Sequence, residues 1–229
     1  MNAKTLLITG ASSGIGEATA RAAAAAGWQL ALAARSQDRL AALVEELGAD
    51  RALAVPCDVT DWDAQQRLVA QTLERFGQLD AAFANAGRGG SPGGFAGGDV
   101  AVWRSLVMVN VYGVMLTLRA CLPALQRSRG HLLLTGSVAG RVTIAGSPYS
   151  ATKWAVSGIG HSVREELKGS GVRVTLIEPG MVDTPFFDEA KPDAMQPENV
   201  AAAVLYALSQ PPTVDVNEIM LRPVTPPGG

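Results

Sequence analysis

The sequence has few of the side chains that form disulfides or bind metals, with two cysteines and two histidines among 229 residues. Cys57 and Cys121 are far apart in the chain and fit no metal-ligand spacing, so we expect two buried, reduced thiols. His131 and His161 stand 30 positions apart and have no cysteine or carboxylate company in the sequence. Metal sites normally need such company, so no metal site is predicted.

Charge is also scarce, because Asp, Glu, Lys and Arg make up 17% of the residues and the formal net charge is -2. This balance gives no electrostatic reason to expect nucleic acid or an anionic membrane as a partner. No unbroken apolar run approaches the roughly 20 residues that cross a bilayer. A strand expected from Lys4 onward leaves no signal peptide before it. We therefore expect a cytoplasmic protein that acts on a small molecule.

What the chain does contain is a regular alternation of short apolar runs and longer helical segments. The predicted strands, most of them continuously hydrophobic as in parallel sheets, are 5–9, 29–34, 51–57, 79–84, 131–135, 173–178 and 218–222. The predicted helices are 16–26, 37–47, 61–76, 100–125, 150–168 and 197–209. This alternation predicts an α/β fold, a doubly wound parallel sheet of about seven strands with helices on both faces. No linker or repeat divides residues 1–229, so we expect a single domain.

A glycine-rich turn, Thr9 to Gly16, follows the first strand and precedes an alanine-rich helix. Gly10 permits a tight turn, Gly14 lets the backbone approach a phosphate, and Gly16 lets the helix pack on the strand. The N–H groups of the helix's first turn then face the anion. The spacing G-x3-G-x-G differs from the commoner G-x-G-x-x-G, and taken alone the turn could be a plain connection.

Tyr149 and Lys153 are four residues apart at the start of a predicted helix, so their side chains share one side. A nearby ammonium stabilises a phenolate and lowers the tyrosine pKa, which makes the phenol a usable proton donor and acceptor. Ser137 follows a strand and so lies at a carboxyl end, where ligands bind. By themselves, the pair could be an ordinary exposed helix pair and Ser137 a turn cap.

Taken together, these motifs resemble the short-chain dehydrogenase/reductase family in its shorter single-domain form, over essentially the whole chain. The matching pieces, in family order, are Thr9–Gly16, Asp58-Val59, Asn85-Ala86-Gly87, Asn110, Ser137, Tyr149-x-x-x-Lys153, and Pro179-Gly180 leading to Thr184. The resemblance implies a Rossmann-type fold, a bound nicotinamide dinucleotide and hydride transfer to or from a carbonyl/alcohol substrate.

The resemblance also implies a role for each matching residue. Tyr149 would be the general acid/base, Lys153 would lower its pKa and hold the nicotinamide ribose, and Ser137 would orient the substrate oxygen. Asn110 would hold a water in the proton relay. Eleven residues separate Ser137 from Tyr149, one fewer than is usual in the family, so the shape of this loop is open.

The cofactor-binding residues implied by the resemblance surround these catalytic candidates. They are Gly10, Ser12, Ser13, Gly14, Ile15, Gly16, Arg35, Ser36, Asp58, Val59, Asn85, Ala86, Gly87, Tyr149, Lys153, Pro179, Gly180, Val182 and Thr184. NAD enzymes usually place an acid at the end of the second strand. Here Ala34 stands at that point, followed by Arg35 and Ser36, which suit the 2′-phosphate of NADP. We expect NADP rather than NAD.

Two irregular segments and two helices complete the expectations. Residues 88–98, with six glycines, are predicted to be a mobile loop at the rim of the cleft, and residues 184–196 a substrate lid. Helices 100–125 and 150–168 are those through which the family commonly pairs subunits, so we expect a homodimer or homotetramer. A non-catalytic redox sensor, or an epimerase or lyase on the same fold, is the alternative function.

Overall fold

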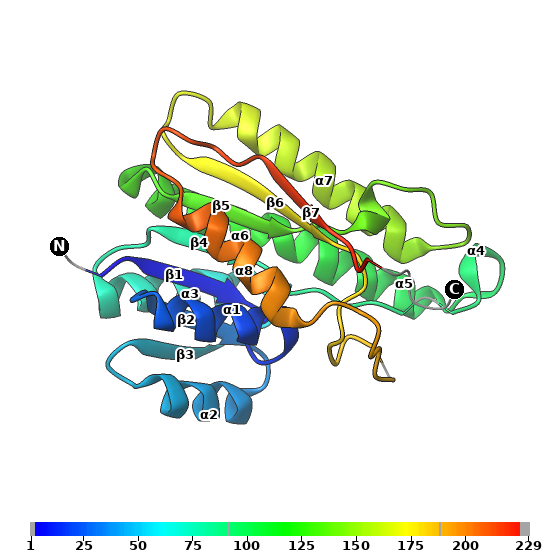
Figure 1. Cartoon of the computed structure of the whole chain (residues 1–229), viewed down its shortest axis with the longest axis horizontal. Helices are drawn as coiled ribbons and strands as arrows, with labels where there is room; N and C mark the ends of the chain where they lie inside the picture. Colours follow the sequence, from blue (N-terminus) through cyan, green and yellow to red (C-terminus); the bar gives the residue numbers. More distant parts are fainter. Residues whose placement is uncertain (1–2, 91, 188, 225–229) are drawn as a thin grey trace.

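The computed structural model describes residues 3–90, 92–187 and 189–224. Within them, seven parallel strands form one sheet in the order β3-β2-β1-β4-β5-β6-β7 (Figure 1). The strands are β1 (Thr5–Thr9), β2 (Gln29–Ala34), β3 (Ala52–Pro56), β4 (Ala81–Ala84), β5 (His131–Thr135), β6 (Arg173–Pro179) and β7 (Glu218–Leu221). The predicted doubly wound α/β fold is confirmed, with small differences at the strand ends.

The strand order reverses beside β1, since β2 pairs with one edge of β1 and β4 pairs with the other. In doubly wound sheets the ligand crevice lies at the carboxyl ends of the strands around such a reversal. The segments that follow β1, β4 and β5 begin with Gly10, Asn85 and Gly136. The topology therefore brings the predicted motifs to one edge of the sheet.

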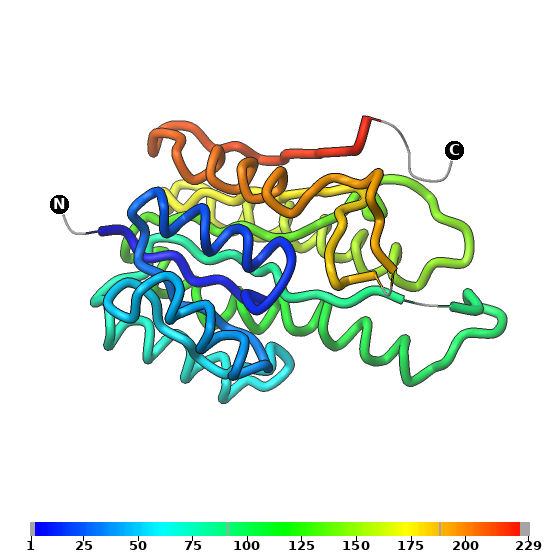
Figure 2. Tube along the Cα trace, turned by 60° about the horizontal axis from the view of Figure 1, so that its bottom comes forward, coloured from blue at the N-terminus to red at the C-terminus, as the bar shows by residue number. Residues whose placement is uncertain are grey.

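Two layers of helices cover the sheet (Figures 1 and 2). One face carries α1 (Gly14–Ala25), α2 (Gln37–Leu47) and α8 (Pro197–Ser209), and the other carries α3 (Trp62–Phe76), α6 (Gly113–Ser128) and α7 (Pro148–Glu166). Successive strand residues point to opposite faces. In β1, Leu6 and Ile8 accordingly join one apolar cluster while Leu7 joins the other. A strand buried on both sides needs a continuous apolar run, and this is why β1, β2, β4, β5 and β6 could be predicted.

Capping residues fix several helix ends. The Asp61 carboxylate accepts hydrogen bonds from the N–H groups of Asp63 and Ala64 at the start of α3, and Gly77 ends that helix in the left-handed conformation. At α7 the predicted start is two residues late. Pro148 already occupies the first turn, where its missing N–H needs no partner, and the Ser147 hydroxyl caps the helix.

The predicted helix 100–125 is not a regular helix. It consists of α5 (Val100–Val107), the π-helical segment η1 (Met108–Tyr112) and α6. The glycine-rich segment 88–98 also contains a short helix, α4 (Gly94–Gly97), which the sequence analysis did not predict. Residue 91 of that segment and residue 188 of the predicted lid lie outside the described residues.

The run Val100–Ser128 also corrects the expectation about membrane-spanning segments. Over an 18-residue window its mean hydropathy is 1.6, so by length and composition it could cross a membrane. Arg104, Asn110 and Arg119 interrupt the apolar run without lowering the average enough to exclude it. In the fold, one side of α6 packs into the core beside β4 and α3. The core helix of a globular protein satisfies the same criterion.

Candidate active site

The glycine turn after β1 has a geometry that other residues would strain. The φ angle is 68° at Gly10 and 55° at Gly14, in the left-handed region that favours glycine. Space is short as well, because a Cβ on Gly10 would lie 2.8 Å from the Ala86 Cα, and one on Gly16 would overlap the Gly10 carbonyl oxygen. The first-turn N–H groups of α1 have no acceptor within the helix. They and the helix dipole form a phosphate cradle, which fits the pyrophosphate of a dinucleotide.

Asn85 holds this turn against the neighbouring strands. Its Nδ2 donates to the carbonyl oxygens of Thr9 (3.1 Å) and Gly10 (3.4 Å), and its Oδ1 accepts from the Thr135 hydroxyl (3.0 Å). One side chain thus joins the carboxyl ends of β1, β4 and β5. Asn85 acts as a positioning residue, while Ala86 packs directly against the turn.

A hollow of about 330 Å³ lies beside the turn. It is lined by Ser12, Ser13, Glu17, Arg21, Arg39, Ala42, Leu43, Glu46 and Pro185. Arg21 pairs with both Glu17 and Glu46, each at 2.7 Å. Among the described residues, Arg39 forms no salt bridge. Arg39 was not predicted from the sequence, although its place in the first turn of α2, just after Arg35 and Ser36, was an available signal.

Arg35 stands at the end of β2, as predicted, but it is exposed and does not line this hollow. Its charge lies near Asp58. The Thr60 backbone N–H and hydroxyl both donate to Asp58 Oδ1, at 2.9 and 2.8 Å. The N–H bond is the main reason that the pKa of Asp58 is lowered, and Arg35 adds to it. Ser36 precedes α2, and its hydroxyl forms no cap bond.

Asn110 lies inside η1 and is almost completely buried. Its Oδ1 accepts from the Arg88 N–H (2.8 Å), and its Nδ2 donates to the Arg88 carbonyl (2.9 Å) and the Thr152 hydroxyl (3.1 Å). Gly87 is next to this amide, since a Cβ there would be 3.5 Å from Oδ1 and 3.8 Å from Lys153 Nζ. The side chain therefore fixes the segment after β4 against α7. The water-holding role implied by the family resemblance stays a prediction.

Ser137 caps the short 3-10 helix η2 (Val138–Gly140) by accepting from the Ala139 N–H (3.1 Å). Its hydroxyl donates to the Pro179 carbonyl (3.3 Å) and also contacts the Tyr149 phenol. The cap and the candidate catalytic position are thus the same residue. Pro179 ends β6, and Gly180 donates its N–H to the Leu221 carbonyl (2.7 Å).

Tyr149 and Lys153 lie on one side of α7, as the four-residue spacing predicts. The Lys153 Nζ is 5.8 Å from the centre of the Tyr149 ring and donates to the Thr135 carbonyl (2.8 Å). Lys153 is 5% exposed, and this burial lowers its pKa to about 8. A backbone carbonyl thus holds the ammonium of Lys153 over the face of the Tyr149 ring.

The predicted direction of the Tyr149 pKa shift is wrong for this structure. Burial raises the pKa of Tyr149 to about 12, and the hydrogen bond with Ser137 lowers it only in part. Burial is therefore the larger effect, and Phe186 of the lid is one of the side chains that pack against the Tyr149 ring, edge-on, with ring centres 5.6 Å apart. An apolar cover disfavours the charged phenolate.

The predicted lid follows β6 and returns to the sheet. Val182 and Met195 pair as an isolated bridge, and the Met195 N–H donates to the Met181 carbonyl (3.2 Å). Thr184 reaches the glycine turn, since a Cβ on Gly14 would lie 3.1 Å from the Thr184 Cβ. The lid therefore touches the phosphate cradle at Thr184 and the phenol at Phe186.

Arg141 anchors the short segment between Ser137 and Tyr149. Its Nε donates to Glu178 Oε1 (2.7 Å), and a terminal nitrogen pairs with Glu218 Oε1 (2.6 Å). Glu178 is completely buried; Ser157 also donates to its Oε1 (3.3 Å), and its Oε2 has no partner among the described residues. These contacts hold the first part of the loop, whose shape the sequence left open, against β6 and β7.

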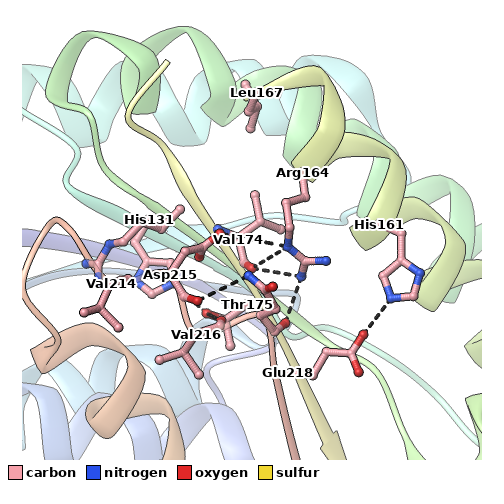
Figure 3. Close-up of polar contacts among 12 residues, drawn as sticks. His131, His161, Arg164, Leu167, Val174, Thr175, Val214, Asp215, Val216 and Glu218 are labelled. Atoms are coloured by element: carbon pink, nitrogen blue, oxygen red, sulfur yellow. Dashed lines mark hydrogen bonds and ion pairs between the residues drawn. The ribbon is translucent and has the colours of Figure 1, made fainter. Parts of the chain in front are cut away.

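A second polar cluster ties β5, β6 and the segment before β7 at the opposite end of the sheet (Figure 3). Thr175 donates to the Val216 carbonyl (2.5 Å), so the 2.7 Å contact with His131 requires the proton on His131 Nε2. Burial lowers the pKa of His131 to about 3. Arg164 adds a bond to the Asn217 carbonyl (2.8 Å). His131 thus links β5 to β6 by a buried hydrogen bond. No group of three or more potential metal ligands comes together in the part of the chain described.

Comparisons with known proteins agree with this architecture. The sequence matches the family described as short chain dehydrogenase over residues 4–195. An uncharacterized oxidoreductase of Staphylococcus aureus (strain MRSA252) is 40% identical over 226 residues, which cover 96% of this chain and 97% of the relative. Alcohol dehydrogenase from the archaeon Thermococcus sibiricus, complexed with 5-hydroxy-NADP, has a TM-score of 0.90 and 36% identity, with 97% of each chain covered.

A further solved structure, 3-ketoacyl-(acyl-carrier-protein) reductase from Brucella melitensis complexed with NADH, has a TM-score of 0.87 and 27% identity, covering 96% and 97% of the two chains. The sheet and its glycine turn are thus those of a Rossmann-like oxidoreductase. The chain belongs to the short-chain dehydrogenase family.

Proposed function

We propose that this protein transfers a hydride between NADP(H) and a carbonyl/alcohol pair, with Tyr149 as the general acid/base. The observation that carries the proposal is the convergence of Ser137, Tyr149 and Lys153 at the carboxyl edge of the sheet, beside the phosphate cradle. A protein that only senses redox state would not need these three side chains together.

When bound, NADPH supplies the hydride to the carbonyl carbon. The Tyr149 phenol gives its proton to the carbonyl oxygen. The Ser137 hydroxyl gives up its long bond to the Pro179 carbonyl (3.3 Å) and donates instead to this oxygen, which orients it. Lys153 stabilises the phenolate that remains. In alcohol oxidation Tyr149 accepts the proton instead. Asn110 and Asn85 keep the segments after β4 in place for these steps.

The preference for NADP rests on the chain between β2 and α2. Ala34 offers no carboxylate to ribose hydroxyls, whereas Arg35 and Ser36 precede a helix whose first turn adds Arg39. Arginine suits a phosphate because its planar fork donates two parallel bonds. Arg39, Ser12 and Ser13 line the same hollow, which supports a second cation beside the adenosine ribose. The related structures above carry both NADP-type and NADH ligands, so membership in the family does not decide between NADP and NAD. The proposed preference for NADP therefore rests on these residues.

The experiment is a set of initial rates of NADPH oxidation with a panel of aldehydes and ketones. Tyr149→Phe should lower turnover at least ~100-fold and leave NADPH affinity nearly unchanged. Lys153→Ala should weaken both. Tyr206→Phe, on the exposed side of α8, is the matched control and should keep wild-type rates. If Tyr149→Phe keeps them too, the proton-transfer role is wrong, and an epimerase, lyase or sensor function gains support.

We further propose a homodimer or homotetramer in the cytoplasm. Large apolar side chains remain exposed on α5, α6 and α7: Val107 (51%), Met115 (51%) and Trp154 (49%). α7 packs beside α5 and η1, so these helices form a continuous surface. Pairing between copies would bury it. The cytoplasmic location fits two buried, unpaired thiols.

A further inference from the structure

The ring of Phe186 occupies space directly beside the catalytic phenol. It meets the Tyr149 ring edge-on at 64°, with centres 5.6 Å apart. On another side it covers the backbone of Gly89, where a Cβ would overlap the ring. Gly89 comes from the segment after β4, Tyr149 from α7 and Phe186 from the lid. Three distant parts of the chain therefore shape this space.

The shape of this space suits a flat ring. Gly89 offers bare backbone on one side, and the Tyr149 ring offers its π system on another. Edge-to-face contacts between rings are more favourable than the same contacts with aliphatic chains of equal area. Phe187 continues the apolar lining, with its ring 5.3 Å from that of Phe186.

Phe186 is also only loosely held in this position. Its side chain remains 40% exposed, and in the part of the chain described it packs on the Tyr149 and Phe187 rings and on the Gly89 backbone. Its backbone N–H makes a long bond within the lid, to the Thr184 hydroxyl (3.4 Å). A ligand ring that makes the same contacts can therefore replace it at small cost.

We propose that this space is a ring subsite, and that the substrate is a carbonyl compound, or the corresponding alcohol, bearing a flat aromatic ring next to the reacting carbon. The ring takes the place of the Phe186 side chain, which brings the carbonyl to the Tyr149 phenol. The inference rests on the proposed function, because it needs Tyr149 to face a carbonyl. Phe186 then acts as an internal competitor, which reduces apparent substrate affinity by the fraction of time it fills the space.

Two substitutions with opposite expected effects test the subsite. Phe186→Ala removes the competitor and should lower the KM for benzaldehyde about 2- to 10-fold, the range expected for one aromatic contact. Gly89→Ala places a methyl group in the space and should raise that KM by at least a similar factor. The comparison substrate is propanal, which is too small to need the space, so its KM should change by a clearly smaller factor than the benzaldehyde KM in both variants.

Matched controls come from the same part of the chain. A Cβ on Gly97 meets nothing within 4 Å, and Phe95 is an exposed residue that packs on Trp103. Gly97→Ala and Phe95→Ala should therefore behave as wild type. Because the new methyl group could also clash with Phe186 itself, Phe186→Ala/Gly89→Ala is made as well. It should fold normally and still bind benzaldehyde worse than Phe186→Ala alone.

The outcomes separate the two proposals. Three results would overturn the ring subsite: equal changes of KM for benzaldehyde and propanal, a higher benzaldehyde KM in Phe186→Ala, or turnover of aliphatic carbonyls only. Each of these would leave the proposed function standing. No NADPH oxidation with any carbonyl of the panel would overturn the proposed function itself, and the subsite with it.

Discussion

Replacing Arg141 tests how strongly the core depends on one buried ion pair. Arg141→Met removes the guanidinium that contacts Glu178 at 2.7 Å, and leaves a carboxylate that is 0% exposed with one weaker donor, Ser157. Breaking a buried pair in this way costs about 3–5 kcal/mol, because the remaining charge stays out of water. For a domain of this length, roughly 2–4 °C of melting temperature corresponds to each kcal/mol. The expected loss is therefore about 6–20 °C in a thermal unfolding experiment followed by circular dichroism.

The chain supplies its own control at the same distance. Arg21 and Glu46 also meet at 2.7 Å, but their side chains are 45% and 48% exposed. Water solvates the carboxylates of Glu46 and Glu17 that Arg21→Met leaves behind, so this substitution should change the melting temperature little. Adding Glu178→Gln to Arg141→Met should restore part of the loss, since the uncompensated charge is gone. Equal shifts for Arg21→Met and Arg141→Met, or no recovery in the double variant, would refute the argument from burial.

Three further predictions concern acid stability, cofactor choice and assembly. His131 is neutral when folded, with its pKa lowered to about 3, so its contribution to stability is complete above its unfolded pKa of ~6.5 and is lost as pH falls toward 3, by about 1.4 kcal/mol per pH unit. In urea unfolding between pH 7 and 5, wild type should therefore lose about 2 kcal/mol more than His131→Gln. Arg35→Ala should weaken NADPH binding about 10- to 100-fold and spare NADH, as charged hydrogen bonds predict; equal losses in the two titrations would show that Arg35 faces solvent. Light scattering of the wild type should show a particle of at least two 23.7 kDa chains, and Trp154→Glu should dissociate it. A wild-type monomer at micromolar concentration would contradict this.

Most of the fold could be predicted because its signals are local. β1 is buried on both faces, so all five of its residues are apolar or threonine, and the turn that follows needs glycine where φ is positive. The spacing of Tyr149 and Lys153 places them on one side of α7 regardless of the rest of the chain. These features are determined within a few residues, and sequence patterns report them directly.

The features that the sequence analysis missed depend on distant contacts. The direction of the Tyr149 pKa shift is set by burial in the assembled fold, where Phe186, a lid residue far along the chain, packs against the ring. The engagement of Asn110 with Arg88 depends on η1, which has no periodic signature of its own. Arg39 joins the hollow only because α2 packs beside the glycine turn. Such contacts follow from the assembled fold rather than from spacing.

The π-helical segment η1 has a consequence for how this chain tolerates change. An α-helix turns about 100° per residue, and a π segment accommodates one residue more than a regular turn would. Deleting a single residue between Val107 and Gly113 would regularise the helix but rotate one half against the other. Either Asn110 would leave Arg88, or the buried side of α6 would turn away from the sheet. The helix formed by α5, η1 and α6 should therefore tolerate substitution of its exposed side chains far better than a change in its length.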